Sequence, residues 1–269
     1  MPLKSPHRVI STRRRWSKAI ANLLAPKSSY GRLDEVQLSD EGLGFDRFGM
    51  EVESTQLAVS IYQRLFEQYF IVKSVGTENI PDRSPFIVTP NRMAPMPVDV
   101  LLISADILKN KLDQPKLLRP MLHPWLAEVP FINQLLTKTG AVWATPKNMH
   151  TALELGEPLL VFPQGRRSTL ERLSGRREQL RAVSSRVIEL GLRHRVPIIP
   201  VALNCTGSPR SRGTTTDSCS RHVTIIYGEP FLAHEQVIDS DPSPAQLRAL
   251  ADRLQNKVQQ LIESAREAP

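Results

Sequence analysis

The chain has 269 residues, of which 41% are hydrophobic, and this is enough to bury the core of one large α/β domain. No run approaches the roughly 18 to 20 apolar residues of a membrane-spanning helix, and the first residues do not resemble a secretory signal. The net charge is +8, and residues 1–30 supply seven Lys or Arg without an acid, so the remainder is nearly neutral.

After a basic arm and irregular connector over residues 1–53, the pattern predicts a single domain over residues 54–269. Ser54 is expected to cap a helix that ends near Phe70. Further helices are predicted over 99–108, 131–138, 146–155, 177–195 and 243–266. Strands are predicted over 70–75, 85–89, 117–122, 141–144, 158–162, 196–203 and 223–227. This alternation favours an α/β fold, with a mixed, largely parallel sheet flanked by helices.

Two segments near the carboxyl end depart from regular patterns. The strand at 196–203 contains Pro197 and Pro200, which predicts an edge or a bulge rather than the centre of the sheet. Residues 206–220 are polar and low in complexity, and we expect a loop between two strands there. Cys205 and Cys219 show neither metal-ligand spacing nor a paired-disulfide framework, which favours a reducing compartment.

The amino-terminal arm has an amphipathic pattern. Trp16, Ile20, Leu23 and Leu24 fall near one helical face with basic residues beside them, as in a helix that lies on a membrane surface. A disordered basic arm or a transit-like leader explains the same residues. Nucleic acid is not expected as a partner, because no recognised binding motif is present and aromatic residues make up only 6%.

Two loops that follow apolar strands organise the chain. Residues 88–102 begin as an apolar run and break at Pro90-Asn91, with Asp99 placed in the first turn of the next helix. Residues 159–167 begin in the same way and break at Pro163. Such loops present functional groups at the carboxyl edge of an α/β sheet, so two of them in one domain suggest one site.

These loops and two further segments resemble the glycerolipid acyltransferases of the lysophosphatidic acid type. The resemblance extends from about Tyr69 to Leu203 and rests on four segments in the family's order. They are Pro90-Asn91 with Asp99, Gly140-Ala141-Val142 followed by Thr145-Pro146-Lys147-Asn148, Phe162-Pro163-Gln164-Gly165, and Val196-Pro197-Ile198-Ile199-Pro200-Val201. It implies a glycerol-3-phosphate acyltransferase-like fold and transfer of an acyl chain from a thioester to glycerol phosphate or a lysophospholipid.

The family's general base is a histidine directly after the asparagine, and an aspartate orients it. Here Arg92 stands in the histidine position, whereas Asp99 is retained. A guanidinium stays protonated at accessible pH, so Arg92 cannot accept the proton of an acceptor hydroxyl. Arg92 can instead pair with Asp99, and we expect the two to face each other at one cleft. His123 is the best substitute base by position, although a lone histidine is more often structural.

The third segment also departs from the family, because Gln164 replaces its glutamate. The amide keeps the size of the side chain but removes a negative charge. Arg166 and Arg167 suit a phosphate or carboxylate if they line the cleft, and otherwise form a solvated basic face. By the resemblance, the substrate-binding residues are Asn91, Phe162, Pro163, Gln164, Gly165, Arg166 and Arg167.

Three interpretations follow. The chain is an acyltransferase with weak activity, a non-catalytic lipid- or acyl-binding protein at a membrane surface, or an adaptor that acts through its basic arm. Loss of a general base costs about 10² to 10⁴ in rate, which favours a weak or lost activity. The donor would be acyl-CoA or an acyl-carrier-protein thioester, with no metal or other cofactor, and the protein would be cytoplasmic and peripheral on the membrane.

Overall fold

The computed structural model describes residues 44–83, 85–92, 98–111, 117–122, 132–162, 185–206, 221–237 and 242–267. The helices are α2 (Val52–Tyr69), α3 (Val98–Asn110), α4 (Ile132–Lys138), α5 (Pro146–Glu154), α7 (Ser185–His194) and α8 (Pro244–Glu267), with short 3-10 helices η2 (Thr77–Asn79) and η4 (Ala233–Glu235). The strands are β1 (Ile71–Val75), β2 (Ile87–Pro90), β3 (Arg119–Leu122), β4 (Val142–Trp143), β5 (Leu159–Leu160), β6 (Ile198–Thr206) and β7 (His222–Tyr227).

The strands form one mixed sheet in the order β1-β7-β6-β2-β5-β3-β4. β6 and β7 pair antiparallel, whereas the other neighbouring strands pair parallel. The prediction of a mixed, largely parallel sheet flanked by helices is therefore confirmed. Because β2, β5 and β6 run in the same direction, the loops after β2 and β5 leave the sheet at one edge.

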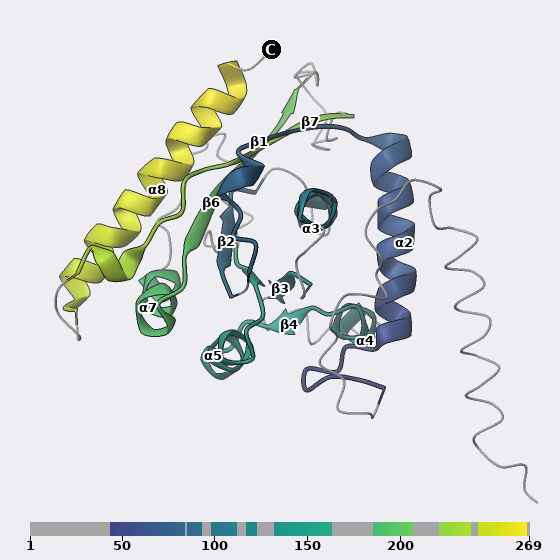
Figure 1. Cartoon of the computed structure of the whole chain (residues 1–269), viewed down its shortest axis with the longest axis horizontal. Coiled ribbons are helices and arrows are strands. Elements are labelled where there is room, and N and C mark those ends of the chain that lie inside the picture. Colours follow the sequence, from purple (N-terminus) through teal and green to yellow (C-terminus); the bar gives the residue numbers. More distant parts are fainter. Residues whose placement is uncertain are drawn as a thin grey trace, which may run out of the picture.

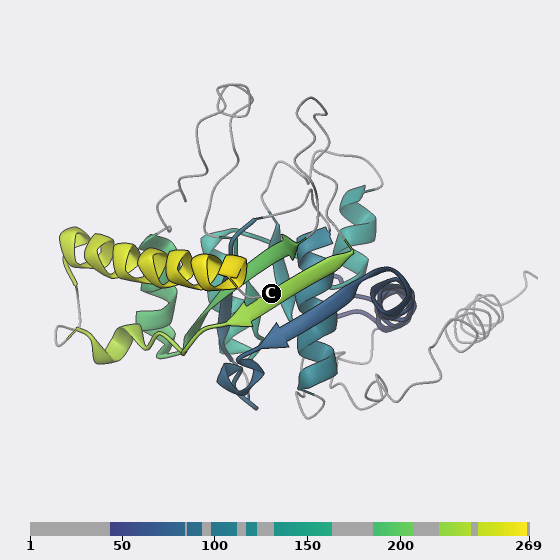
Figure 2. The ribbon, with the colours of Figure 1, turned by 90° about the horizontal axis from the view of Figure 1, so that it is seen from above.

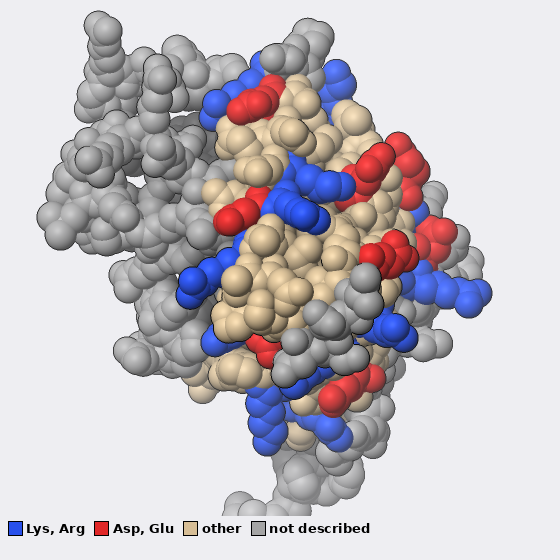
Figure 3. Space-filling view, turned by 90° about the vertical axis from the view of Figure 1, so that its left-hand side faces the viewer, with Lys and Arg blue, Asp and Glu red and all other residues tan. Residues whose placement is uncertain are grey.

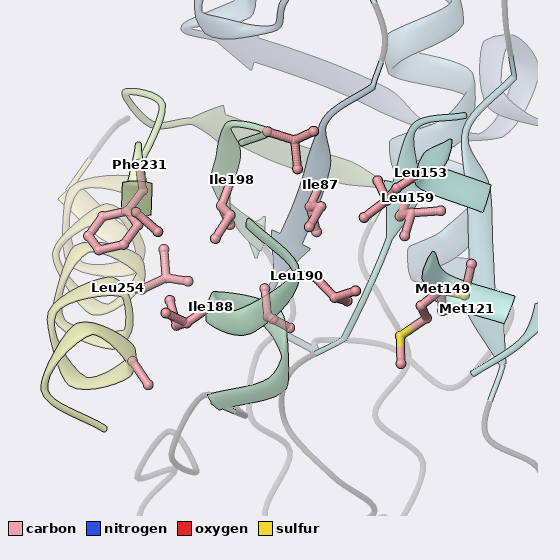
Figure 4. Packing of buried hydrophobic residues seen from close by; sticks show 14 of the residues in the cluster. Ile87, Met121, Met149, Leu153, Leu159, Ile188, Leu190, Ile198, Phe231 and Leu254 are labelled. Atoms are coloured by element: carbon pink, nitrogen blue, oxygen red, sulfur yellow. The ribbon is translucent and has the colours of Figure 1, made fainter. Parts of the chain in front are cut away.

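Helices cover both faces of the sheet (Figure 1). Successive strand residues point to opposite faces, so Ile87 packs into the cluster under α5, α7 and α8, while Val88 packs into the cluster under α3. Figure 4 shows the first cluster, in which Ile198 and Leu190 lie between Ile87 and the side chains of Phe231 and Leu254. β2 in the centre of the sheet is apolar because both of its faces are buried.

Local signals fix the helix starts with different accuracy. The Thr145 hydroxyl accepts a hydrogen bond from the Asn148 N–H at 3.2 Å, and Pro146 occupies the first turn of α5, as the sequence predicts. α2 begins at Val52, two residues before the expected cap Ser54. The Ser54 hydroxyl instead donates to the Glu51 carboxylate at 2.8 Å.

The expectation that the prolines place the strand at 196–203 at an edge or a bulge is wrong. β6 lies between β2 and β7. The Asn91 N–H donates to the Val201 carbonyl at 3.3 Å, so Val201 bonds towards β2, and the adjacent Pro200 bonds towards the opposite side. There the Pro200 carbonyl accepts from the Gly228 N–H at 2.9 Å, and the missing N–H of Pro200 removes no bond to β2.

The interpretation that the cysteines form no disulfide framework is also wrong. Cys205 in β6 is disulfide-bonded. The argument from cysteine usage for a reducing compartment therefore loses its basis. Among the described residues, no helix is long and apolar enough to cross a membrane.

Residues just before α2 are attached to the domain by a buried ionic cluster. The Arg119 guanidinium pairs with the carboxylates of Asp46 and Glu157, and its contact with Glu157 is 2.7 Å. All three side chains are buried. Asp46 also accepts hydrogen bonds from the N–H groups of Phe48 and Met50. The described part of the expected connector is thus packed against the sheet.

A histidine pair links α5 to α7 and predicts a pH effect. His150 Nδ1 lies 2.7 Å from His194 Nε2, where one ring donates and the other accepts. Burial, and then the nearby His150, lower the pKa of His194, and Glu154 opposes them. The pKa of His194 is therefore lower in the folded protein than in the unfolded chain, so the folded state favours neutral His194. The stability that depends on neutral His194 is present above about pH 6.5 and is lost as the pH falls below that value.

We therefore expect the free energy of unfolding to fall between about pH 8 and pH 5.5, with His194→Gln reducing that fall. Denaturant titrations across this range measure it. The control is Asn256→Gln on the exposed side of α8, which changes no titratable group and should leave the slope unchanged. Identical slopes for wild type and His194→Gln would contradict the interpretation.

Candidate active site at the carboxyl edge of the sheet

The end of β2 is held by Asn91. The Asn91 side-chain amide donates to the Leu203 carbonyl at 3.1 Å, and its oxygen accepts from the Leu203 N–H at 2.7 Å. Asn91 is 6% exposed, so these bonds are shielded from water. This amide therefore fixes the path of the chain into Arg92 against β6. The prediction that Asn91 binds substrate stays a prediction.

Asn91→Ala should lower the free energy of unfolding by about 2–4 kcal/mol, because it leaves the buried N–H and C=O of Leu203 without partners. Denaturant unfolding measures the loss. Asn256→Ala, on the exposed side of α8, is the control and should stay within about 0.5 kcal/mol of wild type. If Asn91→Ala also changed the free energy of unfolding by no more than about 0.5 kcal/mol, water would be shown to replace the bonds to the N–H and C=O of Leu203. The end of β2 would then not depend on the Asn91 amide.

Arg92 joins the two predicted loops. Its guanidinium carbon lies 4.5 Å from the centroid of the Phe162 ring, a cation–π contact between the residue after Asn91 and the residue two positions beyond β5. Arg92 is exposed at the edge of the sheet. Partial desolvation of the guanidinium lowers the pKa of Arg92, and the negative charge of Asp99 raises it. This contact brings the ends of the two loops together, and that they form one site stays a prediction.

Asp99 lies in the first turn of α3 and is completely buried. A carboxylate there is favoured by the positive end of the helix dipole. Its negative charge raises the pKa of Arg92, so the two groups lie within reach of each other's charge, and their role in one site stays a prediction. The arrangement offers a cation supported by an aromatic ring and a buried carboxylate, but Arg92 cannot accept a proton. It suits the binding of an anionic group better than the activation of a hydroxyl.

The other predicted site residues lie outside the described residues. These are His123, Pro163, Gln164, Gly165, Arg166 and Arg167. Their roles stay predictions. Within the described part of the chain, no group of three or more His, Cys, Asp or Glu side chains is arranged to hold a metal ion.

The structure adds two features of the site that the sequence did not indicate. Phe162, which the resemblance assigned to substrate, stacks on Arg92. Leu203 contributes only backbone atoms, to Asn91. The spacing between Arg92 and Phe162 could not reveal their contact, since it depends on the pairing of β2 with β5.

The family follows from comparison with known proteins. Residues 71–204 match the family model described as Acyltransferase, and this stretch includes β2, α3, β5 and most of β6. The chain belongs to the acyltransferase family, and the resemblance seen in its sequence is confirmed.

Particular relatives and one solved structure are also similar to the chain. Uncharacterized proteins of Mycobacterium bovis and Mycobacterium tuberculosis are each 26% identical over 187 residues, covering 69% of this chain and 51% of theirs. The chain thus spans about half the length of the curated relatives it matches. The 1-acyl-sn-glycerophosphate (LPA) acyltransferase PlsC of Thermotoga maritima is similar in fold, with a TM-score of 0.55, 16% identity and coverage of 96% of this chain and 98% of that chain.

Proposed function

We propose that the chain binds an acyl thioester and a lysophospholipid- or glycerol-phosphate-type acceptor at the carboxyl edge of the sheet, and that it transfers the acyl chain weakly or not at all. Membership of the acyltransferase family supports the reaction class. The observation behind the weak activity is Arg92, which stacks on Phe162 beside the charge of Asp99 and occupies the position of the family's base.

The chemistry explains why this one residue matters. In acyl transfer, the acceptor oxygen forms a bond to the thioester carbonyl carbon, the carbon–sulfur bond breaks, and the hydroxyl proton passes through a base to the departing thiolate. A permanently protonated guanidinium cannot take that proton. Binding and orientation of the two substrates would remain, and proximity alone supplies part of the rate.

Arg92 has a second consequence for the acceptor. A guanidinium matches phosphate and carboxylate groups through two parallel N–H bonds. The Phe162 ring lies against the face of this guanidinium, whereas the N–H bonds to an oxyanion run from the guanidinium edge, so the ring contact and anion binding use different parts of the group. An acceptor with a phosphate therefore fits the position better than a neutral one. The same contact supports the alternative function, a non-catalytic protein that holds a lipid or an acyl thioester at a membrane surface.

Titration with a non-reactive thioether analogue of acyl-CoA and with lysophosphatidic acid tests the proposal. Wild type should bind both ligands, and Arg92→Ala should weaken the phosphate-bearing lipid about tenfold or more through loss of a charge-assisted pair. Leu135→Ala, at an exposed position on α4, is the control and should change neither affinity. A chain that binds neither ligand would overturn the proposal.

Membrane attachment through the amino-terminal segment is part of the proposal, as is its cytoplasmic, peripheral location. Each basic residue near an anionic bilayer contributes about 1 kcal/mol, within a Debye length of roughly 8 Å at physiological salt. We expect weak, salt-sensitive sedimentation of the full chain with anionic liposomes. A chain that starts at Ser28, which lacks the seven basic residues, should sediment less. Equal sedimentation would refute the assignment.

A further inference from the structure

The outer edge of the sheet exposes apolar side chains. β1 is the outermost strand, and Ile71 and Val75 are 57% and 42% exposed, with Tyr69 just before the strand 51% exposed. We call the surface formed by Tyr69, Ile71, Lys73, Val75 and Arg221 the β1 edge patch. Exposed large apolar side chains are common singly, but several on one strand face mark a surface that meets an apolar environment.

The alternation of β1 explains this exposure. Val72 packs into the core beneath α3, and the Ser74 hydroxyl donates to buried Asp106 at 2.5 Å. Ile71, Lys73 and Val75 must therefore point to the opposite face. On that face α8 packs against β6 and β7, and β1 lies on the far side of β7 (Figure 2). The outward residues of β1 are beyond the cover of α8.

The strand register places the β1 edge patch on the same side of the molecule as the candidate site. Val75 of β1 pairs with Ile226 of β7, and Ile226 pairs with Ala202 of β6. Ala202 directly follows the β6 residue that pairs with Pro90 at the end of β2. Val75 is therefore level with the end of β2. Ile71 lies four residues farther out, which is about 13 Å beyond that level at ~3.3 Å per residue. A flat surface that meets Ile71 thus lies next to the edge where Arg92 and Phe162 meet.

The charges beside the apolar residues are basic. Lys73 shares their face of β1, and the Arg221 guanidinium lies 5.6 Å from the Tyr69 ring centroid. Arg221 also donates to the Tyr69 carbonyl at 3.0 Å, which holds it beside the patch. The surface on the side of the molecule where α8 lies at the left of Figure 1 is different, because Lys and Arg are interspersed there with Asp and Glu (Figure 3). Apolar groups flanked by cations and an aromatic ring complement an anionic bilayer surface.

We propose that the β1 edge patch lies on an anionic bilayer, with Ile71 and Val75 in the interfacial region and Lys73 and Arg221 at the headgroups. This contact is additional to the amino-terminal segment. It turns the carboxyl edge of the sheet towards the bilayer. The contact itself does not depend on the proposed function, whereas the idea that this orientation brings lipid substrates to the candidate site rests on it. A second copy of the chain is a poorer occupant, since antiparallel pairing of β1 about its middle residue would place two Lys73 side chains opposite each other.

Sedimentation of the full chain with phosphatidylcholine vesicles containing phosphatidylglycerol tests the apolar contribution. Ile71→Ser combined with Val75→Ser should weaken partitioning about tenfold, because two apolar contacts are lost. Leu135→Ser is the matched control, since Leu135 is 62% exposed on α4, and it should bind like wild type. Thermal unfolding of each variant confirms that the fold is intact.

A charge reversal gives a second measurement that does not depend on the strand variant folding. Lys73→Glu should weaken binding severalfold at low salt and have little effect on vesicles of phosphatidylcholine alone. Arg248→Glu, exposed on α8, makes the same charge change elsewhere and should have less effect. Equal effects of Lys73→Glu and Arg248→Glu, or unchanged binding of the Ile71→Ser/Val75→Ser chain, would overturn the proposal.

The oligomeric state separates a bilayer from a second copy as the occupant. A dimer of the wild type that the Ile71→Ser/Val75→Ser change converts to a monomer, without loss of vesicle binding, would also overturn the proposal. None of these measurements needs turnover or a bound substrate. A negative result is therefore distinct from failure of the proposed acyl-transfer or acyl-binding function.

Discussion

Changing Arg92 to His and Gln164 to Glu together should raise the rate of acyl transfer from a thioester to a lysophospholipid by about 10² to 10⁴ over the wild-type chain. Histidine returns a group that accepts the hydroxyl proton near neutral pH. Asp99 is already buried in the first turn of α3, where its charge reaches residue 92. The glutamate returns the negative charge that the family has in the third segment.

Thioester release and lipid product should be followed together across several acceptors. Residues that act as a unit are strongly non-additive, so either single change is expected to give little activity. Arg92→Lys combined with Gln164→Glu is the matched control, because it keeps a cation at residue 92 and restores only the carboxylate. Equal rates for this control and the histidine-bearing double variant would show that a base at residue 92 does not limit the reaction.

Arg119→Met should lower the free energy of unfolding by about 3–5 kcal/mol. Arg119 is the cation between the buried carboxylates of Asp46 and Glu157, and its removal leaves two like charges uncompensated. One oxygen of Glu157, Oε2, is buried without a hydrogen-bond partner in the structure, so this carboxylate depends on Arg119 for its charge balance. Urea unfolding followed by circular dichroism measures the loss.

The matched control removes the whole cluster. Arg119→Met with Asp46→Asn and Glu157→Gln leaves no buried charge and should recover part of the lost stability, since neutral replacements of buried ion pairs are often tolerated. Exposed Arg248→Met on α8 should cost less than about 0.5 kcal/mol. If Arg119→Met also lowered the free energy of unfolding by less than about 0.5 kcal/mol, water would be shown to reach the carboxylates of Asp46 and Glu157.

The sequence predicts the mixed sheet, and it predicts that the loops after β2 and β5 come together, because both depend on local patterns. Short apolar runs that stop at Pro90 and after Phe162 mark strands buried on both faces, and these two loops do meet where Arg92 stacks on Phe162. The family resemblance adds the expectation that residue 92 and Asp99 share a site, and the charge of Asp99 does raise the pKa of Arg92, but the shared site stays a prediction.

Features that depend on strand order could not be read in the same way. Proline in β6 argued for an edge, but its effect depends on which side of the strand each N–H faces, and Pro200 faces away from β2. The bonds from Asn91 to Leu203 join positions 112 residues apart in sequence. The disulfide of Cys205 likewise has no signal in spacing alone.

The most direct test of the account is the turnover of an acyl thioester by the wild-type chain, measured beside Arg92→Ala with lysophosphatidic acid as acceptor. If Arg92 stands where the base is missing, wild type should form little or no lipid product, and Arg92→Ala should not restore it, because alanine supplies no base. Brisk turnover by the wild type that survives Arg92→Ala would contradict the account, since it would place the catalytic base elsewhere in the chain.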